Sequence, residues 1–190
     1  MRGWFFPALL VFAASIVSGE GVESTLGELQ QRFENGSSEA KEFEIAENDA
    51  NAYLRAQGAG TLPEGIESPW IRFEDSVAVV GATVDLDRFR SSLPDSMIFQ
   101  LLSGRVPVEV TARLTGEKGV GTLSLDRVLF AGIELPPALV AMMADGSKAN
   151  AFLPPGFRLG EPFPLPLELE SIRCLIGSVR LKQGPTAGTK

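Results

Sequence analysis

Residues 106–130 read VPVEVTARLTGEKGVGTLSLDRVLF. Apolar side chains occupy every second position of the first half, and polar or charged residues or a proline stand between them. The apolar positions are Val106, Val108, Val110, Ala112 and Leu114. A period of two is typical of a strand with one apolar and one wet face. Because the turn-forming residues 116–119 follow, this stretch predicts an antiparallel hairpin.

The second half of the stretch changes its pattern once. Leu123 and Leu125 share one parity, whereas Val128 and Phe130 have the other. In a regular strand, side chains of different parity point to opposite faces. A bulge absorbs one extra residue and so brings the later apolar side chains back to the same face. We therefore expect a bulge or bend near residues 126–127.

The flanking segments supply further strands and several short helices. Apolar residues at helical spacing predict helices over residues 24–33, 47–55, 86–102 (kinked or divided at Pro94) and 137–143. Alternation predicts strands at 43–45, in two segments between 66 and 84 joined at 74–76 with a bulge at Gly81, at 163–169 as an edge strand because of its prolines, and at 172–181. The expected fold class is α+β: one domain, residues 20–183, with a long, bent antiparallel sheet and helices set against it. Residues 184–190 read as a polar, disordered tail.

Residues 1–19 have the order of a secretory signal peptide. Arg2 gives a positive start, an apolar run follows from Trp4 to Val17, and small residues stand at Ser18 and Gly19. The run is short for a membrane span, which needs roughly twenty residues. We expect cleavage near Gly19 and export to the periplasm or the extracellular space; an uncleaved N-terminal anchor is the alternative.

Composition narrows the chemistry. The chain has 17 basic and 24 acidic residues, a net charge of −7, which disfavours nucleic-acid binding. It contains no histidine, so serine–histidine, cysteine–histidine and histidine–zinc sites are excluded. The one cysteine, Cys174, cannot form an internal disulfide and is expected to be a buried apolar residue. Carboxylate-only and serine–lysine chemistry remain open.

Two pairs of acidic residues have ordinary structural explanations. Asp85 and Asp87 could hold a cation in an extended segment, but acidic residues at a helix start are the more common case. Glu168 and Glu170 could form an acid–base pair, but strand exteriors often carry such pairs. We therefore assign no catalytic residue, no metal and no cofactor, and expect a protein that is not an enzyme.

The amount of apolar sheet surface is the more informative feature. Four strands offer an apolar face, whereas the helices are short. The sheet has either an ordinary core or a curl that encloses an apolar ligand such as a lipid acyl chain. Candidate groove residues are Val108, Val110, Leu123, Leu125, Met142, Met143, Phe163, Leu165 and Leu167.

Several motifs resemble those of a known family. They are residues 45–54 (IAENDANAYL), 71–73 (IRF), 77–79 (VAV), Gly81, 84–86 (VDL), 132–139 (GIELPPAL), 163–166 (FPLP) and 177–181 (GSVRL). This pattern resembles bacterial exported LmeA-type phospholipid-binding proteins, which are related to the tubular lipid-binding (TULIP-like) group. The resemblance implies a curved sheet wrapped around one or more helices, with a groove for phospholipid tails, and carries over no catalytic residue.

The expected function is therefore lipid binding in the cell envelope, for transfer or sensing. The expected partners are a phospholipid or another acyl lipid and, transiently, a membrane surface. One alternative is an envelope structural or interaction protein of the same fold with a filled core. A carboxylate-dependent hydrolase is a second alternative; Trp70 is the one tryptophan after residue 19 that could stack on a sugar.

Overall fold

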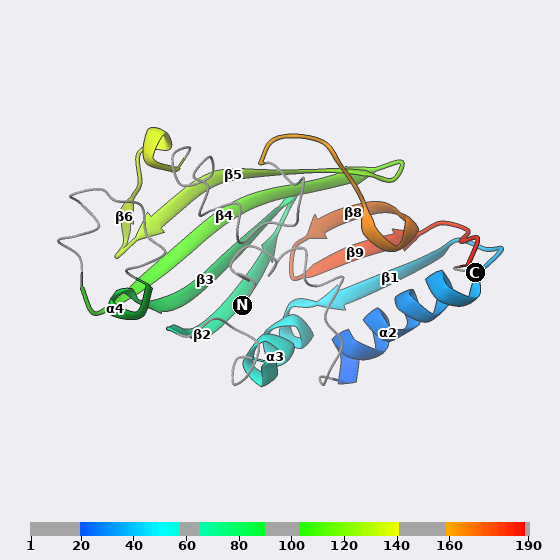
Figure 1. Ribbon diagram of the computed structural model, residues 1–190, viewed down its shortest axis with the longest axis horizontal. Coiled ribbons are helices and arrows are strands. Elements are labelled where there is room, and N and C mark those ends of the chain that lie inside the picture. The colour runs from blue at the N-terminus through cyan, green and yellow to red at the C-terminus, as the bar shows by residue number, and fades with distance from the viewer. Residues whose placement is uncertain (1–19, 58–64, 90–102, 141–158, 189–190) are drawn as a thin grey trace.

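The computed structural model describes residues 20–57, 65–89, 103–140 and 159–188. Its elements (Figure 1, in which β7 and η4 carry no label) are α2 (Glu20–Asn35), β1 (Lys41–Ala46), α3 (Glu47–Gln57), β2 (Ile66–Glu74), β3 (Val77–Asp85), α4 (Leu86–Phe89), β4 (Arg105–Glu117), β5 (Val120–Phe130), β6 (Ile133–Glu134), β7 (Phe163–Pro164), the 3₁₀ turn η4 (Pro166–Glu168), β8 (Leu169–Leu175) and β9 (Ser178–Gln183). Residues 1–19, and with them the expected signal peptide, lie outside the described residues.

The expected hairpin is confirmed as β4 and β5. Leu114 pairs with Leu123, and Val110 pairs with Val128. The register shifts between Thr111 and Ala112, which leaves Asp126 as the extra residue and keeps the apolar side chains of both strands on one face. The predicted bulge is therefore confirmed. The turn is tighter than expected, because the strands continue to Glu117 and Val120.

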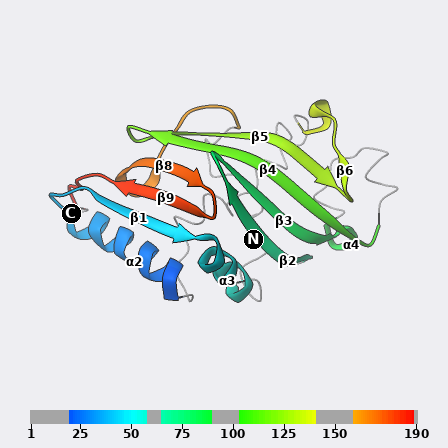
Figure 2. The ribbon, with the colours of Figure 1, turned by 180° about the vertical axis from the view of Figure 1, so that it is seen from behind.

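The strands of the described residues form one nine-stranded antiparallel sheet in the order β1-β9-β8-β4-β3-β2, with β5 on the other edge of β4. β4 pairs with β3 along residues 105–112 and with β8 at residues 115–116. The sheet thus divides along β4. β2 and β3 lie in one half of the molecule, β1, β8 and β9 with α2 lie in the other, and the β4–β5 hairpin runs across both (Figures 1 and 2).

The sheet is strongly curled and forms a half-barrel around α2 and α3. Apolar residues of both helices belong to the same core cluster as the inward side chains of the strands. α3 follows β1 directly, and its Glu47 Oε2 accepts a hydrogen bond from the Phe73 amide of β2 at 2.8 Å. The helix therefore links the two outer strands of the curl. The fold is a single α+β domain with a long curved antiparallel sheet, as the sequence predicted.

The core consists of two clusters on the concave side. The smaller cluster lies toward the ends of β2 to β5 that are remote from α2, and its buried members are Val84, Leu86, Val106 and Phe130. The larger cluster joins the helices to β1, β8 and β9, and its buried residues include Val22, Leu26, Leu29, Phe43, Ile45, Tyr53, Ile71, Phe73, Leu114, Leu123, Leu169, Cys174 and Leu181.

Two expected strands differ from the prediction. The single strand over 172–181 is wrong: β8 and β9 form a hairpin that turns at Ile176 and Gly177, where Gly177 has a φ of 77°. The strand over 163–169 is also wrong, because Phe163–Pro164 forms a short strand of its own and Leu169 already belongs to β8. Pro162, Pro164 and Pro166 lack the N–H that a ladder needs, and the chain enters η4 instead.

The expected bulge at Gly81 lies instead in the partner strand. The register of β2 against β3 shifts between Glu67 and Trp70, whereas β3 pairs with β4 without interruption. The indole ring of Trp70 lies over Gly81, and a Cβ at Gly81 would come within 2.2 Å of the Trp70 ring. The glycine is thus needed for a side chain on the convex face rather than for a backbone irregularity.

Helix lengths and the C-terminal segment need further correction. α2 is longer at both ends than the expected helix over 24–33. α4 ends at Phe89, and the rest of the expected helix 86–102 lies outside the described residues. A helix begins at Pro137 as expected, and its described part ends at Val140. The tail was expected to be disordered, which is wrong for residues 184–188: Thr186 is buried and pairs with Ser37. No helix in the described ranges has the length and apolar character that crossing a membrane requires.

Candidate functional site

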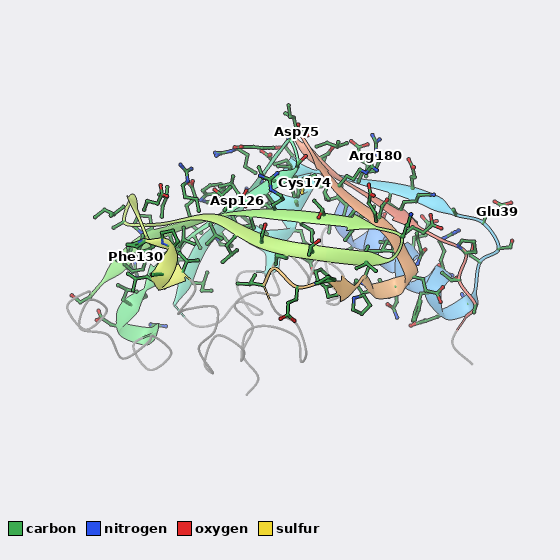
Figure 3. The ribbon with its side chains drawn as sticks, turned by 90° about the horizontal axis from the view of Figure 1, so that it is seen from above. Glu39, Asp75, Asp126, Phe130, Cys174 and Arg180 are labelled. Carbon is green, nitrogen blue, oxygen red and sulfur yellow. The ribbon has the colours of Figure 1, made fainter. Side chains whose placement is uncertain are left out.

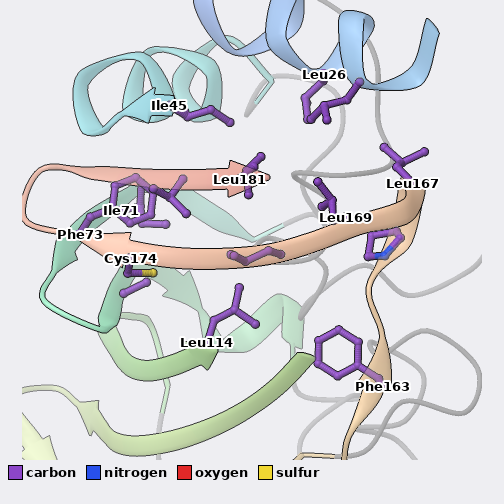
Figure 4. Close-up of a pocket in the computed structure, with 15 residues that line it drawn as sticks. Leu26, Ile45, Ile71, Phe73, Leu114, Phe163, Leu167, Leu169, Cys174 and Leu181 are labelled. Carbon is purple, nitrogen blue, oxygen red and sulfur yellow. The ribbon is translucent and has the colours of Figure 1, made fainter. Parts of the chain in front are cut away.

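An apolar cavity lies on the concave side of the half-barrel, among the side chains of the larger core cluster (Figure 4). Its volume is about 50 Å³. The described residues that line it are all apolar: Leu26, Leu29, Ile45, Ile71, Phe73, Ala78, Leu114, Phe163, Pro166, Leu167, Leu169, Ile172, Cys174, Val179 and Leu181. Because none of these described lining residues is charged at neutral pH, the cavity suits a hydrocarbon.

Each wall of the cavity follows from a local pattern. Leu26 and Leu29 lie three residues apart on α2 and so share one face of that helix. On the strands, alternate positions such as Val179 and Leu181 point inward, while Arg180 points to solvent. η4 completes the wall with Pro166 and Leu167.

The structure places the nine predicted groove residues in different surroundings. Phe163 and Leu167 line the cavity. Leu123, Leu125 and Leu165 belong to or pack against the larger cluster but do not line the cavity. Two further positions, Met142 and Met143, lie outside the described residues.

Val108 and Val110 are half-buried positions of β4 between the two clusters. Val108 packs against the smaller cluster. Val110 pairs with Val80, which packs against the larger one. With Leu125 they are half-buried apolar residues on the concave face of β3, β4 and β5, hereafter the concave strip (Val80, Val108, Val110 and Leu125).

The side chain of Leu165 packs into a notch that two glycines leave in the β4–β5 hairpin, hereafter the glycine notch. Gly116 and Gly121 are paired across the hairpin, and a Cβ on either would come within 3 Å of Leu165. The Leu165 amide also donates to the Gly119 carbonyl oxygen at 2.8 Å. Its side chain is 7% exposed. Leu165 is therefore a close-packed anchor rather than a groove residue.

Cys174 is a cavity residue that the sequence predicted only as buried. Its side chain is 4% exposed, and burial raises the pKa of its thiol to about 11. The thiol thus stays neutral near pH 7 and is a poor nucleophile there. The alternation of Ile172 and Cys174 was the signal that placed it inside.

Gln183 is a buried polar residue whose contacts the sequence did not predict. It is 0% exposed, and its side-chain Nε2 donates to the carbonyl oxygens of Leu29 in α2 (3.0 Å) and Leu167 in η4 (2.8 Å). Its Oε1 accepts from Arg32 Nε at 3.0 Å. The sequence does contain a sign of its burial. Position 183 continues the alternate, inward-facing positions Val179 and Leu181 of β9.

The expected acidic pairs are structural. Asp85 Oδ1 accepts from the amides of Asp87 and Arg88, so it caps α4. Glu170 forms an ion pair with Lys182 at 2.6 Å, and Glu168 lies in η4 rather than beside it on a strand. Within the described ranges, no group of three or more His, Cys, Asp or Glu side chains could hold a metal ion.

The convex face carries rows of opposite charges. Arg180 pairs with Glu44 and Arg113 pairs with Asp126, and Figure 3 shows Arg180 and Asp126 on the outer side of the curled sheet. Hydrogen bonds from Ser178 and then Arg180 lower the pKa of Glu44. Among the described residues, basic side chains on this face are paired with acidic ones, an arrangement that does not favour a polyanion.

No protein-family model and no curated protein matches this chain. The resemblance to LmeA-type proteins therefore stays a prediction.

Proposed function

We propose that this protein is an exported lipid-binding protein that holds phospholipid or fatty acyl chains on the concave side of its sheet, for lipid transfer or sensing in the cell envelope. The observation that carries the proposal is the cavity, whose described walls are entirely apolar and which lies inside a curled sheet. The half-buried concave strip extends this apolar surface along β3, β4 and β5. The motif resemblance to LmeA-type proteins agrees with it.

Apolar burial could supply the affinity without a cofactor. Each buried methylene group contributes about 0.8 kcal/mol, so roughly ten of them contribute about 8 kcal/mol before the cost of ordering is subtracted. That cost is at least several kcal/mol. A cavity of about 50 Å³ is much smaller than the roughly 300–1,000 Å³ of a typical small-molecule site. The bound chain must therefore displace side chains of the cavity wall.

The test is to fill the cavity. Ala78 lines it and is 0% exposed, so Ala78→Val adds two methyl groups where there is free volume. We expect weaker binding of a fluorescent fatty acid by delipidated protein, with stability unchanged or increased by about 0.5–2 kcal/mol. Ala46→Val, on an exposed position of β1, is the matched control and should leave binding unchanged.

Mass spectrometry of lipids extracted from the protein of its native host supplies the second arm. Copurified acyl lipid supports the proposal. A wild type that carries no lipid and binds no fluorescent fatty acid contradicts it.

The small volume of the cavity favours a second candidate. A protein of the same fold with a filled core would serve as a structural or interaction protein of the envelope. For such a protein, Ala78→Val should stabilise the fold, and no lipid should copurify. The two candidates therefore differ in the lipid measurement rather than in the melting temperature.

A further inference from the structure

Two neighbouring residues of the cavity's described wall reach solvent. Its lining residues are all buried except Pro166 and Leu167, which are half-buried. Both belong to η4, which lies against α2. Figure 4 shows Leu167 at this edge of the cavity, on the side of Leu26. The side chain of Leu167 thus stands between the cavity and the outside.

The backbone of this turn has an unusual conformation. Leu167 has φ 56° and ψ 28°, and Glu168 has φ 55°. Left-handed values are rare for residues with a side chain, and two in succession are rarer still. Neither residue is a glycine, so the surrounding structure must hold the turn in this state.

The contacts that hold the turn can be identified. On its N-terminal side Leu165 is fixed in the glycine notch of the hairpin, and on its C-terminal side Leu169 is 2% exposed. Between these anchors, the Leu167 carbonyl oxygen accepts from Gln183 Nε2, and the same amide group reaches Leu29 of α2. One buried amide therefore joins the turn to the helix across the edge of the cavity.

We propose that the turn Pro166–Glu168 is the gate of the cavity, with Leu167 as its plug and Gln183 as its latch, and that it opens away from α2 to admit the end of a linear apolar chain. Opening breaks the Gln183–Leu167 hydrogen bond and releases the left-handed backbone. The identity of the chain rests on the proposed function, whereas the opening movement does not. The gate also accounts for how a cavity too small for an acyl chain could receive one.

Cys174 provides a reporter inside the cavity, because it lines the wall and is the one cysteine of the chain. The experiment follows the rate at which methyl methanethiosulfonate, a small apolar thiol reagent, modifies Cys174 in the full protein, alongside the melting temperature of each variant. In the closed state the thiol is 4% exposed, so the rate measures opening.

Two variants change the gate in opposite directions. Leu167→Ala removes the plug and should accelerate modification at least about tenfold. Glu168→Gly removes an exposed side chain and lowers the energetic cost of the left-handed backbone. It therefore favours the closed turn and should slow modification by roughly fivefold. Gln183→Met removes the latch at similar size and should accelerate modification; the first two variants decide the question if this one folds poorly.

The first two variants each have a matched control. Leu159→Ala truncates another half-buried leucine that packs on the same cluster but does not line the cavity. Ala131→Gly relaxes another left-handed residue, at φ 54°, in the turn between β5 and β6. Neither should change modification beyond its effect on global stability. Rates that follow the melting temperature alone, across all variants, overturn the gate because Cys174 is then reached by global unfolding.

Adding a lipid to the same experiment tests the gate and the proposed function separately. Oleic acid should protect Cys174 in the wild type. Variant rates in the expected order without protection support the gate and contradict lipid binding at the cavity. Protection with rates that follow only the melting temperature supports lipid binding and overturns the gate.

Discussion

Asn51 bonds to both backbone polar groups of Ile71. Its Nδ2 donates to the Ile71 carbonyl oxygen at 2.7 Å, and the Ile71 amide donates to Asn51 Oδ1 at 2.9 Å. Ile71 belongs to β2, which ends the strand order of the sheet. The amide of Asn51 therefore takes the place that a neighbouring strand would occupy, and it satisfies groups that are costly to leave unpaired. Through this contact α3 closes the curl against its far edge.

Loss of this contact should destabilise the fold. Asn51→Ala leaves the N–H and C=O of Ile71 unpaired at a residue that is 3% exposed. We expect a loss of about 2–4 kcal/mol in the free energy of unfolding, measured by urea denaturation. Arg55→Ala, on the exposed face of the same helix, should stay within about 0.5 kcal/mol. Equal effects of the two changes would mean that α3 does not close the sheet.

The main features of the fold could be read from the sequence because its strands have one apolar face. The period of two identified the β4–β5 hairpin, and the change of parity after Leu125 located its bulge. A similar change between Cys174 and Val179 was also present. It indicates the turn between β8 and β9, which was missed because residues 172–181 were interpreted as one strand.

The polar contacts could not be read in the same way. The side chains of Asn51 and Gln183 hydrogen-bond to backbone groups of other segments. Such contacts depend on which segments meet in three dimensions. The left-handed conformation of Leu167 contradicts the local preference of leucine, so only the tertiary contacts of η4 explain it. Of the predicted groove residues, Phe163 and Leu167 proved to line the cavity. Others did not, because apolar character alone does not distinguish an anchor such as Leu165 from a lining residue.

The register of the hairpin can be tested at its closed end. Leu114 is 6% exposed and lines the cavity, whereas its neighbour Thr115 is exposed. Leu114→Lys buries an unpaired charge and should cost several kcal/mol, while Thr115→Lys should change the free energy of unfolding by no more than about 0.5 kcal/mol. Thermal melts of the two variants measure the difference. Similar melting temperatures would contradict the register.

Some side chains on the convex face are buried from solvent. Thr111 lies beside buried Val79, and its Oγ1 is buried without a hydrogen-bond partner among the residues described. Thr111→Val keeps the shape and removes the unsatisfied hydroxyl. We expect it to raise the free energy of unfolding by about 0.5–2 kcal/mol. Thr122→Val, at a hydroxyl that bonds to Thr115, is the control and should bring no gain.

Export remains a prediction that one mass measurement can test. If residues 1–19 are a signal peptide, protein from the exported fraction of its native host should begin near Glu20. Intact-mass spectrometry gives the N-terminus directly. A mass that includes residues 1–19 would contradict cleavage and favour an N-terminal anchor.

Cys174 predicts a dependence of stability on alkaline pH. Burial raises the pKa of its thiol from 9.0 to about 11, so the folded state holds the proton more tightly than the unfolded state. This contribution is fully present below pH 9 and is lost as the pH rises through about 11; its size is about 2–3 kcal/mol. Urea denaturation between pH 8 and about 11 should therefore show a steeper loss of stability in the wild type than in Cys174→Val, which has no thiol to ionise. Parallel pH profiles would mean that water reaches the thiol, and hence that the cavity is already open to solvent in the resting protein.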